Sequence, residues 1–215
     1  MRIPTTVAAC VAFTCLACGL ANAATVGKVK KHIYYSPAQN FHVPVPDGLG
    51  MKINDAFRKE RGAGFVSFHD DFGQNDGIAY YRIPTEILLT SKTDDSRREL
   101  LQDFLENVVM KNWQSEFSPN CRLIHHTAGT FEEMPAVFAL AFLPGGSNTT
   151  VINQGIARRL DSRRGLILFV KGTWLYMLAT ETGFLANQSS AEQDDKWMLF
   201  VGREKERYHS ITFTP

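Results

Sequence analysis

Short runs of alternating hydrophobic and polar residues fill most of the chain, and this alternation is typical of β-strands. The first run, "FHVPV" at residues 41–45, ends at a Pro-Asp-Gly stop, and its prolines favour a place at a sheet edge. Two further runs, "GAGFVSFHDD" and "IAYYRIP", are rich in aromatic and β-branched residues. Because "FGQNDG" between them supplies turn residues, we expect these two strands to form a hairpin.

Two segments have helical periodicity instead. Residues 96–113, "SRRELLQDFLENVVMKNW", begin with the capping-box spacing of Ser96 and Glu99. Apolar residues recur along one face of this helix, which we expect to be buried, at Leu101, Phe104, Leu105, Val108 and Val109. A second helix is predicted after "NQSS", with Ser190 as its cap and Trp197 on its packing face, and "SITF" closes the chain as a short strand.

Four apolar runs joined by short turns lie between these helices, at residues 136–143, 151–160, 166–171 and 173–181. Connections this short require neighbouring strands to be antiparallel. The runs "AVFALAFL", "LILFV" and "WLYML" are apolar at both odd and even positions, so both faces of the sheet must be covered. The fold class that we predict is α+β, an antiparallel meander sheet flanked by helices on both faces as an α/β/α sandwich.

The N-terminus has the pattern of a cleaved secretory signal. Arg2 precedes an apolar run at residues 7–20, and "ANA" stands just before Ala24, as at a cleavage site. The apolar run is too short to span a bilayer comfortably. The segment also holds three cysteines, which leave lipid anchoring as the less favoured alternative, namely Cys10, Cys15 and Cys18. We therefore expect export as a soluble protein to the periplasm or the medium.

Removal of residues 1–23 leaves 215 − 23 = 192 residues, which suit one domain better than two. We expect a flexible lead-in at residues 24–39 and a single domain at residues 40–215. Of the four cysteines only Cys121 then remains, so a disulfide within the chain is excluded. Arg2 is the only charge lost, and 23 − 1 = 22 basic residues then face 22 acidic ones. This balance argues against a nucleic acid partner, and no later apolar run approaches membrane-spanning length.

The order of these segments resembles the family of the extrinsic photosystem II subunit P, the PsbP-like proteins. The resemblance covers residues 40–215 and rests on "FHVPVP", "GFVSFHDDFG", the long amphipathic helix, "GTWLYMLATET", and a terminal helix with a tryptophan before a short final strand. The α/β/α fold of that family is shared by a nuclear Ran-binding protein and by many exported bacterial proteins. The resemblance implies a non-catalytic binding or assembly module that docks onto a larger complex, and it transfers no functional residue to this chain.

The acidic stretch "SFHDDFGQNDG" is the first candidate for chemistry. On a strand only alternate residues share a face, so His69 and Asp71 give two ligands at most. A calcium loop places acids at its first, third and fifth positions and then a glycine, but counting from Asp71 the third residue is Gly73 and the sixth is Asp76. We expect a hairpin turn without a metal ion. The weaker alternative is a cation site at Asp70, Asp71 and Asp76.

A second candidate is "CRLIHHTAG", which brings Cys121, His125 and His126 close together in the sequence. A structural zinc site needs four ligands in paired spacings, and no second pair exists. A nucleophilic Cys121 activated by His125 is an alternative, although a single exported cysteine is more often buried. The common motifs of hydrolases, metalloproteases and nucleotide-binding enzymes are absent from the sequence, so we expect no cofactor and no enzymatic activity.

Four arginines surround a predicted turn in "ARRLDSRRG", namely Arg158, Arg159, Arg163 and Arg164. The first pair faces opposite ways at a strand end and the second pair lies in the turn, so two or three of the four are able to converge on an acidic partner surface. The alternative is a solvated turn that keeps the hairpin from associating with other chains.

These observations favour an exported, non-catalytic binding or assembly module that docks on a protein partner in the cell envelope or outside the cell. One alternative is a small exported hydrolase or cation-dependent enzyme that uses the acidic loop or Cys121. The other is a carrier of a lipid or other apolar ligand between sheet and helix, which the aromatic residues Phe169, Trp174 and Tyr176 permit.

Overall fold

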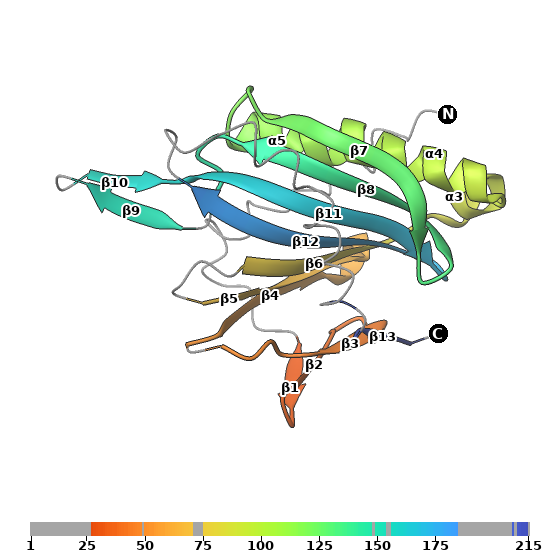
Figure 1. Cartoon of the computed structure of the whole chain (residues 1–215). Coiled ribbons are helices and arrows are strands. Elements are labelled where there is room, and N and C mark those ends of the chain that lie inside the picture. The colour runs from red at the N-terminus through yellow and green to blue at the C-terminus, as the bar shows by residue number, and fades with distance from the viewer. Residues whose placement is uncertain are drawn as a thin grey trace.

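A seven-stranded antiparallel sheet forms the centre of the molecule in the computed structural model (Figure 1). The structure describes residues 27–48, 50–70, 75–147, 149–153, 156–184, 208 and 210–214. The strand order of the central sheet is β4-β5-β6-β12-β11-β8-β7. The strands are β4 (Lys52–Arg58), β5 (Ala63–His69), β6 (Asn75–Arg82), β7 (Arg122–Phe131), β8 (Met134–Leu143), β11 (Asp161–Lys171) and β12 (Trp174–Phe184). The predicted α+β class with an antiparallel sheet is confirmed.

The predicted strands agree with the structure except at one run. β5 and β6 form the expected hairpin, in which His69 is opposite Asn75. The run at residues 151–160 is not a strand of the central sheet, because it is divided between β9 (Thr150–Asn153) and β10 (Ile156–Arg159), which pair only with each other. In Figure 1 this hairpin projects from the body of the molecule. The sequence Asn-Gln-Gly at 153–155 places turn-forming residues inside the run, which explains the division.

One face of the central sheet is covered by helices. They are α3 (Thr85–Thr90) and a continuous helix of α4 (Asp94–Phe104), a π-helical segment (Leu105–Met110) and α5 (Lys111–Glu116). The predicted cap is wrong by three residues. Thr93 is the N-cap: its hydroxyl accepts from the Ser96 amide at 3.2 Å, and its own amide donates to Ser96 Oγ at 3.0 Å. Ser96 thus closes the capping box from its third position, where Glu or Gln is more usual.

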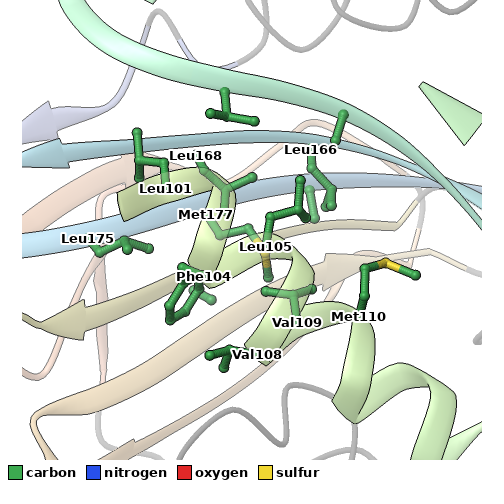
Figure 2. Packing of buried hydrophobic residues seen from close by; sticks show 14 of the residues in the cluster. Leu101, Phe104, Leu105, Val108, Val109, Met110, Leu166, Leu168, Leu175 and Met177 are labelled. Carbon is green, nitrogen blue, oxygen red and sulfur yellow. The ribbon is translucent and has the colours of Figure 1, made fainter. Parts of the chain in front are cut away.

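The continuous helix buries the predicted apolar stripe against the central sheet, as Figure 2 shows. The sheet residues of this cluster include Leu166, Leu168, Leu175 and Met177 of β11 and β12, and α4 also packs on β8. The π-helical segment adds a residue to its turn, and the consecutive side chains of Val108, Val109 and Met110 are all buried. Full burial of such a side chain stabilises the fold by roughly 1.5–3 kcal/mol, so this stripe is a large part of the core.

A small antiparallel sheet covers the opposite face of the central sheet in the described part of the chain. Its strand order is β1-β2-β3-β13, with β1 (Lys28–Lys30), β2 (Ile33–Tyr35), β3 (Phe41–Pro44) and β13 (Thr212–Phe213). Its buried side chains, such as Tyr34 and Phe41, form one cluster with Phe169 and Tyr176 of the central sheet. The second predicted helix, which contains Trp197, lies outside the described residues.

Tyr34 anchors the N-terminal strands. Its side chain is 1% exposed, and its hydroxyl donates to Asp55 Oδ2 at 2.8 Å, the oxygen that also accepts the Gly27 amide. Burial, reinforced by the Asp55 carboxylate, raises the pKa of Tyr34 above its usual value, so the phenol remains a donor. The expected flexible lead-in at residues 24–39 is therefore wrong for β1 and β2, because the exposed strand β1 pairs with β2 and Tyr34 of β2 enters the core.

The expectation that β3 lies at a sheet edge is also wrong. β3 pairs with β2 on one side and with β13 on the other. Pro44 is tolerated because the pairing of β3 with β13 stops at His42. No backbone N–H is needed at position 44 on that side, so the proline removes no hydrogen bond of the sheet.

Replacement of Tyr34 by alanine is expected to lower the free energy of unfolding by about 3–5 kcal/mol, because it empties the volume of an aromatic ring in the core. Tyr35→Ala is the matched control. Tyr35 is 39% exposed on the other face of β2, so its loss should cost no more than about 0.5 kcal/mol. Urea denaturation of both variants measures the difference. Equal small losses would show that β1 and β2 are not part of the folded domain.

Candidate binding site

The structure separates the residues of the acidic stretch. Asp70 follows β5, Asp71 lies outside the described residues, and Asp76 is a buried residue of β6. Thr180 Oγ1 donates to Asp76 Oδ1 at 2.8 Å across the pair of β6 and β12. The alternative of a cation site at the three aspartates is therefore contradicted for Asp76, which is held inside the fold. Within the described ranges, no three His, Cys, Asp or Glu side chains are grouped to hold a metal ion.

Cys121 is buried against the helix, whereas the neighbouring histidines are exposed. The Cys121 thiol is buried and donates to the Trp113 carbonyl with Sγ 3.5 Å from the oxygen. Burial raises the pKa of this thiol and outweighs weaker opposing contributions, so the nucleophilic thiolate is disfavoured. His125 and His126 lie exposed on β7, at the edge of the central sheet. The geometry thus gives no support to nucleophilic catalysis by Cys121 with His125.

The four arginines do not share one turn. Arg163 and Arg164 are 4% and 3% exposed in β11, which pairs along this stretch with β8 and with β12. The predicted turn is wrong at these two positions because β11 begins at Asp161. Arg158 and Arg159 are exposed at the end of β10. Of the four predicted arginines, only Arg158 and Arg159 are therefore exposed to a partner surface.

Arg164 instead forms a buried ion pair with Glu181. The two residues are directly opposite on β11 and β12, and Arg164 Nε and Nη2 donate to Glu181 Oε2 at 3.1 and 2.9 Å. Both side chains are 4% exposed. Ser147 Oγ donates to Glu181 Oε1 at 2.7 Å, and Asn75 Nδ2 donates to Oε2 at 3.0 Å. Both carboxylate oxygens are thus hydrogen-bonded, as a buried charge requires.

The Arg164 guanidinium also ties the central sheet to the helix. It lies over the rings of Trp113 and Phe117, 5.2 and 5.5 Å from their centroids, and Nη2 donates to the Gly146 carbonyl at 2.9 Å. The pairing of Arg164 with Glu181 follows from the turn that joins β11 and β12. The Gly-Thr turn at 172–173 puts residues 171 and 174 opposite each other, and the same register puts Arg164 opposite Glu181.

Phe169, Tyr176 and Trp174 do not lie on the side of the central sheet that the helix of residues 94–116 covers. Phe169 and Tyr176 stack with ring centroids 5.4 Å apart in the core beneath the small sheet, on the face of the central sheet opposite to the helix. Trp174 is half-buried and belongs to an open cleft. These three residues therefore do not border a space between the sheet and the helix of residues 94–116, and the second predicted helix, which contains Trp197, lies outside the described residues.

The open cleft, which we call the basic cleft, has a volume of about 1350 Å³ and lies between the small sheet and one end of the central sheet. Five lining residues are cationic and one is acidic: Lys28, Lys30, Lys59, Arg61 and Arg82 against Glu60. The whole chain carries a net charge of only +1, so this concentration of positive charge is a local feature. A surface of one sign attracts partners of the opposite sign.

One wall of the basic cleft is the outer face of the small sheet. Lys28, Tyr35 and His42 are cross-strand neighbours on β1, β2 and β3. The rings of Tyr35 and His42 stack with centroids 5.3 Å apart and 25° between their planes. These residues alternate with Tyr34 and Phe41, which enter the core, so the sheet turns its polar face to the cleft.

The opposite wall is the connection between β4 and β5. A single 3₁₀ turn, Lys59–Arg61, ends at Gly62, whose φ of +56° favours glycine. A Cβ at Gly62 would lie 2.8 Å from Arg82 Cβ, and the Arg82 amide donates to the Gly62 carbonyl at 2.8 Å. Glycine at this position therefore lets Arg82 lie beside the cations of the turn.

Two half-buried rings, Phe57 and Trp174, form an aromatic platform at the floor of the cleft. Both contact buried Tyr80: Phe57 stacks on it at 6.0 Å and 20°, and Trp174 meets it edge-on at 5.8 Å. Gly64 lies between Phe57 and Tyr80 in one cross-strand row, paired with Phe57 on β4 and with Tyr80 on β6. A Cβ at Gly64 would clash with the Tyr80 hydroxyl. Tyr80 is covered, whereas the next row of the sheet, Arg82 opposite Trp174, borders the open cleft.

Sequence reasoning missed the basic cleft because its cations come from three distant segments. They lie at residues 28–30, 59–61 and 82. The runs "GKVKKH" and "RKERG" contain the charge, but only the pairing within the two sheets and their packing bring these segments together.

Comparison with known proteins shows the fold. No protein-family model matches the chain, and no curated protein matches it. Among solved structures, the chain is similar to cyanobacterial PsbP (CyanoP) from Synechocystis sp. PCC 6803, with a TM-score of 0.50 and 15% identity over 91% of this chain and 99% of that one. The PsbP-like resemblance expected from the sequence is thus confirmed at the level of the fold.

Two looser matches were also found, from which we draw no conclusion. One is a protein from Bacteroides thetaiotaomicron VPI-5482, with a TM-score of 0.41 and 8% identity over 87% of this chain and 50% of that one. The other is LpqN, involved in cell envelope biogenesis of Mycobacterium tuberculosis, with a TM-score of 0.36 and 13% identity over 81% and 83%. In the part of the chain that the structure describes, no helix is long and apolar enough to cross a membrane.

Arg164→Met is expected to lower the free energy of unfolding by about 3–5 kcal/mol, because it leaves the Glu181 carboxylate buried without its cation. The double variant Arg164→Met with Glu181→Leu should lose less than the sum of the two single variants, since it leaves no unpaired charge. Arg158→Met, at an exposed position, is the control and should change stability little. Urea unfolding measures all four variants. Strict additivity in the double variant would mean that the two side chains do not interact.

Proposed function

We propose that this protein is an exported, non-catalytic binding module that docks on a partner protein in the cell envelope or outside the cell through its basic cleft. The observation that carries the proposal is the local excess of cations in the cleft of a chain that is otherwise nearly neutral. The leader-like segment at residues 1–23 supports export. If the protein is exported, the intact mass of the mature protein should be that of a chain that begins at Ala24.

Charge and size both favour a macromolecular partner. Cations on facing walls create a positive potential that steers an acidic surface into the cleft and orients it there. The volume of about 1350 Å³ exceeds the range of roughly 300–1000 Å³ that is usual for small-molecule sites. The buried Cys121 and the engaged Asp76 give the enzymatic alternatives no comparable support.

Arg61→Glu with Arg82→Glu is expected to reduce capture of the partner at least about tenfold, because two exposed cations then repel the acidic surface. Tagged mature protein is mixed with envelope extract at low and at physiological salt, and the retained proteins are quantified by mass spectrometry. Lower salt should strengthen capture, since exposed charges are screened within about 8 Å at physiological ionic strength.

The matched control for this experiment is Arg158→Glu with Arg159→Glu, which reverses two exposed arginines outside the basic cleft. Both double variants should unfold at the temperature of the original protein, because all four positions are exposed. Loss of the partner with the control variant and not with the cleft variant would place docking on the β9–β10 hairpin and contradict the proposal.

A further inference from the structure

We infer that the basic cleft binds a linear acidic peptide segment that carries one large aromatic or aliphatic side chain. This inference rests on the proposed function and specifies the chemistry of the partner at the same site. Three features of the cleft carry it: cations on both walls, an aromatic platform between them, and a concave shape larger than a small-molecule pocket.

The cations lie on both sides of the cleft floor. Lys28 and Lys30 project from the small sheet, Lys59 and Arg61 belong to the opposite turn, and Arg82 borders the platform. A segment with several carboxylates is able to meet both walls at once, and each guanidinium can take a carboxylate in a two-point contact. A single small anion would engage only one wall.

The aromatic platform gives the cleft a surface that binds an apolar side chain, in addition to the cations that bind carboxylates. Phe57 and Trp174 are held at fixed angles by their contacts with Tyr80, so their exposed ring surface is preorganised. A large apolar side chain that inserts between the walls would cover this surface and remove it from water. Arg82 is opposite Trp174 in the strand register, so a carboxylate beside the inserted side chain falls next to a guanidinium.

The shape of the cleft favours a peptide segment over other acidic partners. A membrane surface presents its phosphates in a layer, which would contact the rim of a concave site and not the aromatic rings at its floor. A uniform polyanion would satisfy the cations but would leave the platform uncovered. An extended segment with acidic side chains on both sides of one large apolar side chain satisfies both walls and the floor, and side-chain pockets of this kind give extended peptides their specificity.

A random 12-residue peptide library displayed on phage is the probe. The mature protein is the bait, and Arg61→Glu with Arg82→Glu is the counter-bait. Enriched peptides are expected to contain two or more acidic residues around Trp, Phe, Tyr or Leu. Synthetic copies, measured by fluorescence anisotropy, should lose at least about tenfold in affinity for the counter-bait, and replacement of the large apolar residue by alanine should weaken them similarly.

Two further variants separate the parts of the site. Trp174→Leu keeps an apolar floor but removes the ring, so it should reduce the preference for aromatic over aliphatic peptides. Arg158→Glu with Arg159→Glu should leave peptide affinity unchanged. Thermal unfolding of each variant confirms that the fold is intact before affinities are compared.

The inference is overturned if the enriched peptides lack acidic residues, if they bind the counter-bait equally, or if nothing is enriched. Binding to phosphatidylglycerol vesicles that depends on Arg61 and Arg82, without peptide enrichment, would also overturn it in favour of a membrane surface. Partner capture separates this result from the proposed function. If charge reversal abolishes capture although no acidic peptide is enriched, the docking proposal stands and only the peptide inference fails; if capture is unaffected, both fail.

Discussion

The strands at the middle of the central sheet are apolar on both faces, and the rest of the structure depends on this constraint. In β11, Leu166 and Leu168 face the helix, whereas Ile167 and Phe169 face the small sheet. Neither face is compatible with water, so the chain must provide two covering layers. The continuous helix is one layer, and in the described part of the chain the small sheet is the other.

In the described part of the chain, the basic cleft lies where the small sheet leaves one end of the central sheet open. β1, β2 and β3 have three or four residues each, and the row of Arg82 and Trp174 borders an open cleft at the end of the central sheet. Cations from three segments surround this uncovered row. On the helix side of the sheet the charges of Arg164 and Glu181 are buried and neutralise each other, whereas the cations of the basic cleft are open to solvent. We therefore assign binding to the side of the basic cleft and stability to the side of the helix.

Periodicity predicted β5, β6, β8, β11 and β12 of the central sheet and the buried stripe of the helix, because burial leaves a repeated pattern in the sequence of each element. It did not predict the edge strands β4 and β7. It failed where a charged side chain is buried. The sequence predicts a turn at Arg163 and Arg164, because the partners of a buried guanidinium are known only once the strand register is known. It failed again at residues 28–35, where a single buried ring, Tyr34, is outnumbered by exposed lysines. The cleft lay beyond prediction because its cations are neighbours only after the two sheets have packed.

Site-specific photo-cross-linking tests the central claim most directly. A benzophenone side chain replaces Thr85, which lines the basic cleft, or Thr127, which is exposed on β7 at the far edge of the central sheet. After irradiation in envelope extract, the account predicts a cross-linked product of discrete mass from position 85 that disappears when Arg61 and Arg82 are reversed in charge, and none from position 127. A product from position 127 alone, or one from position 85 that survives the charge reversal, would contradict docking through the basic cleft.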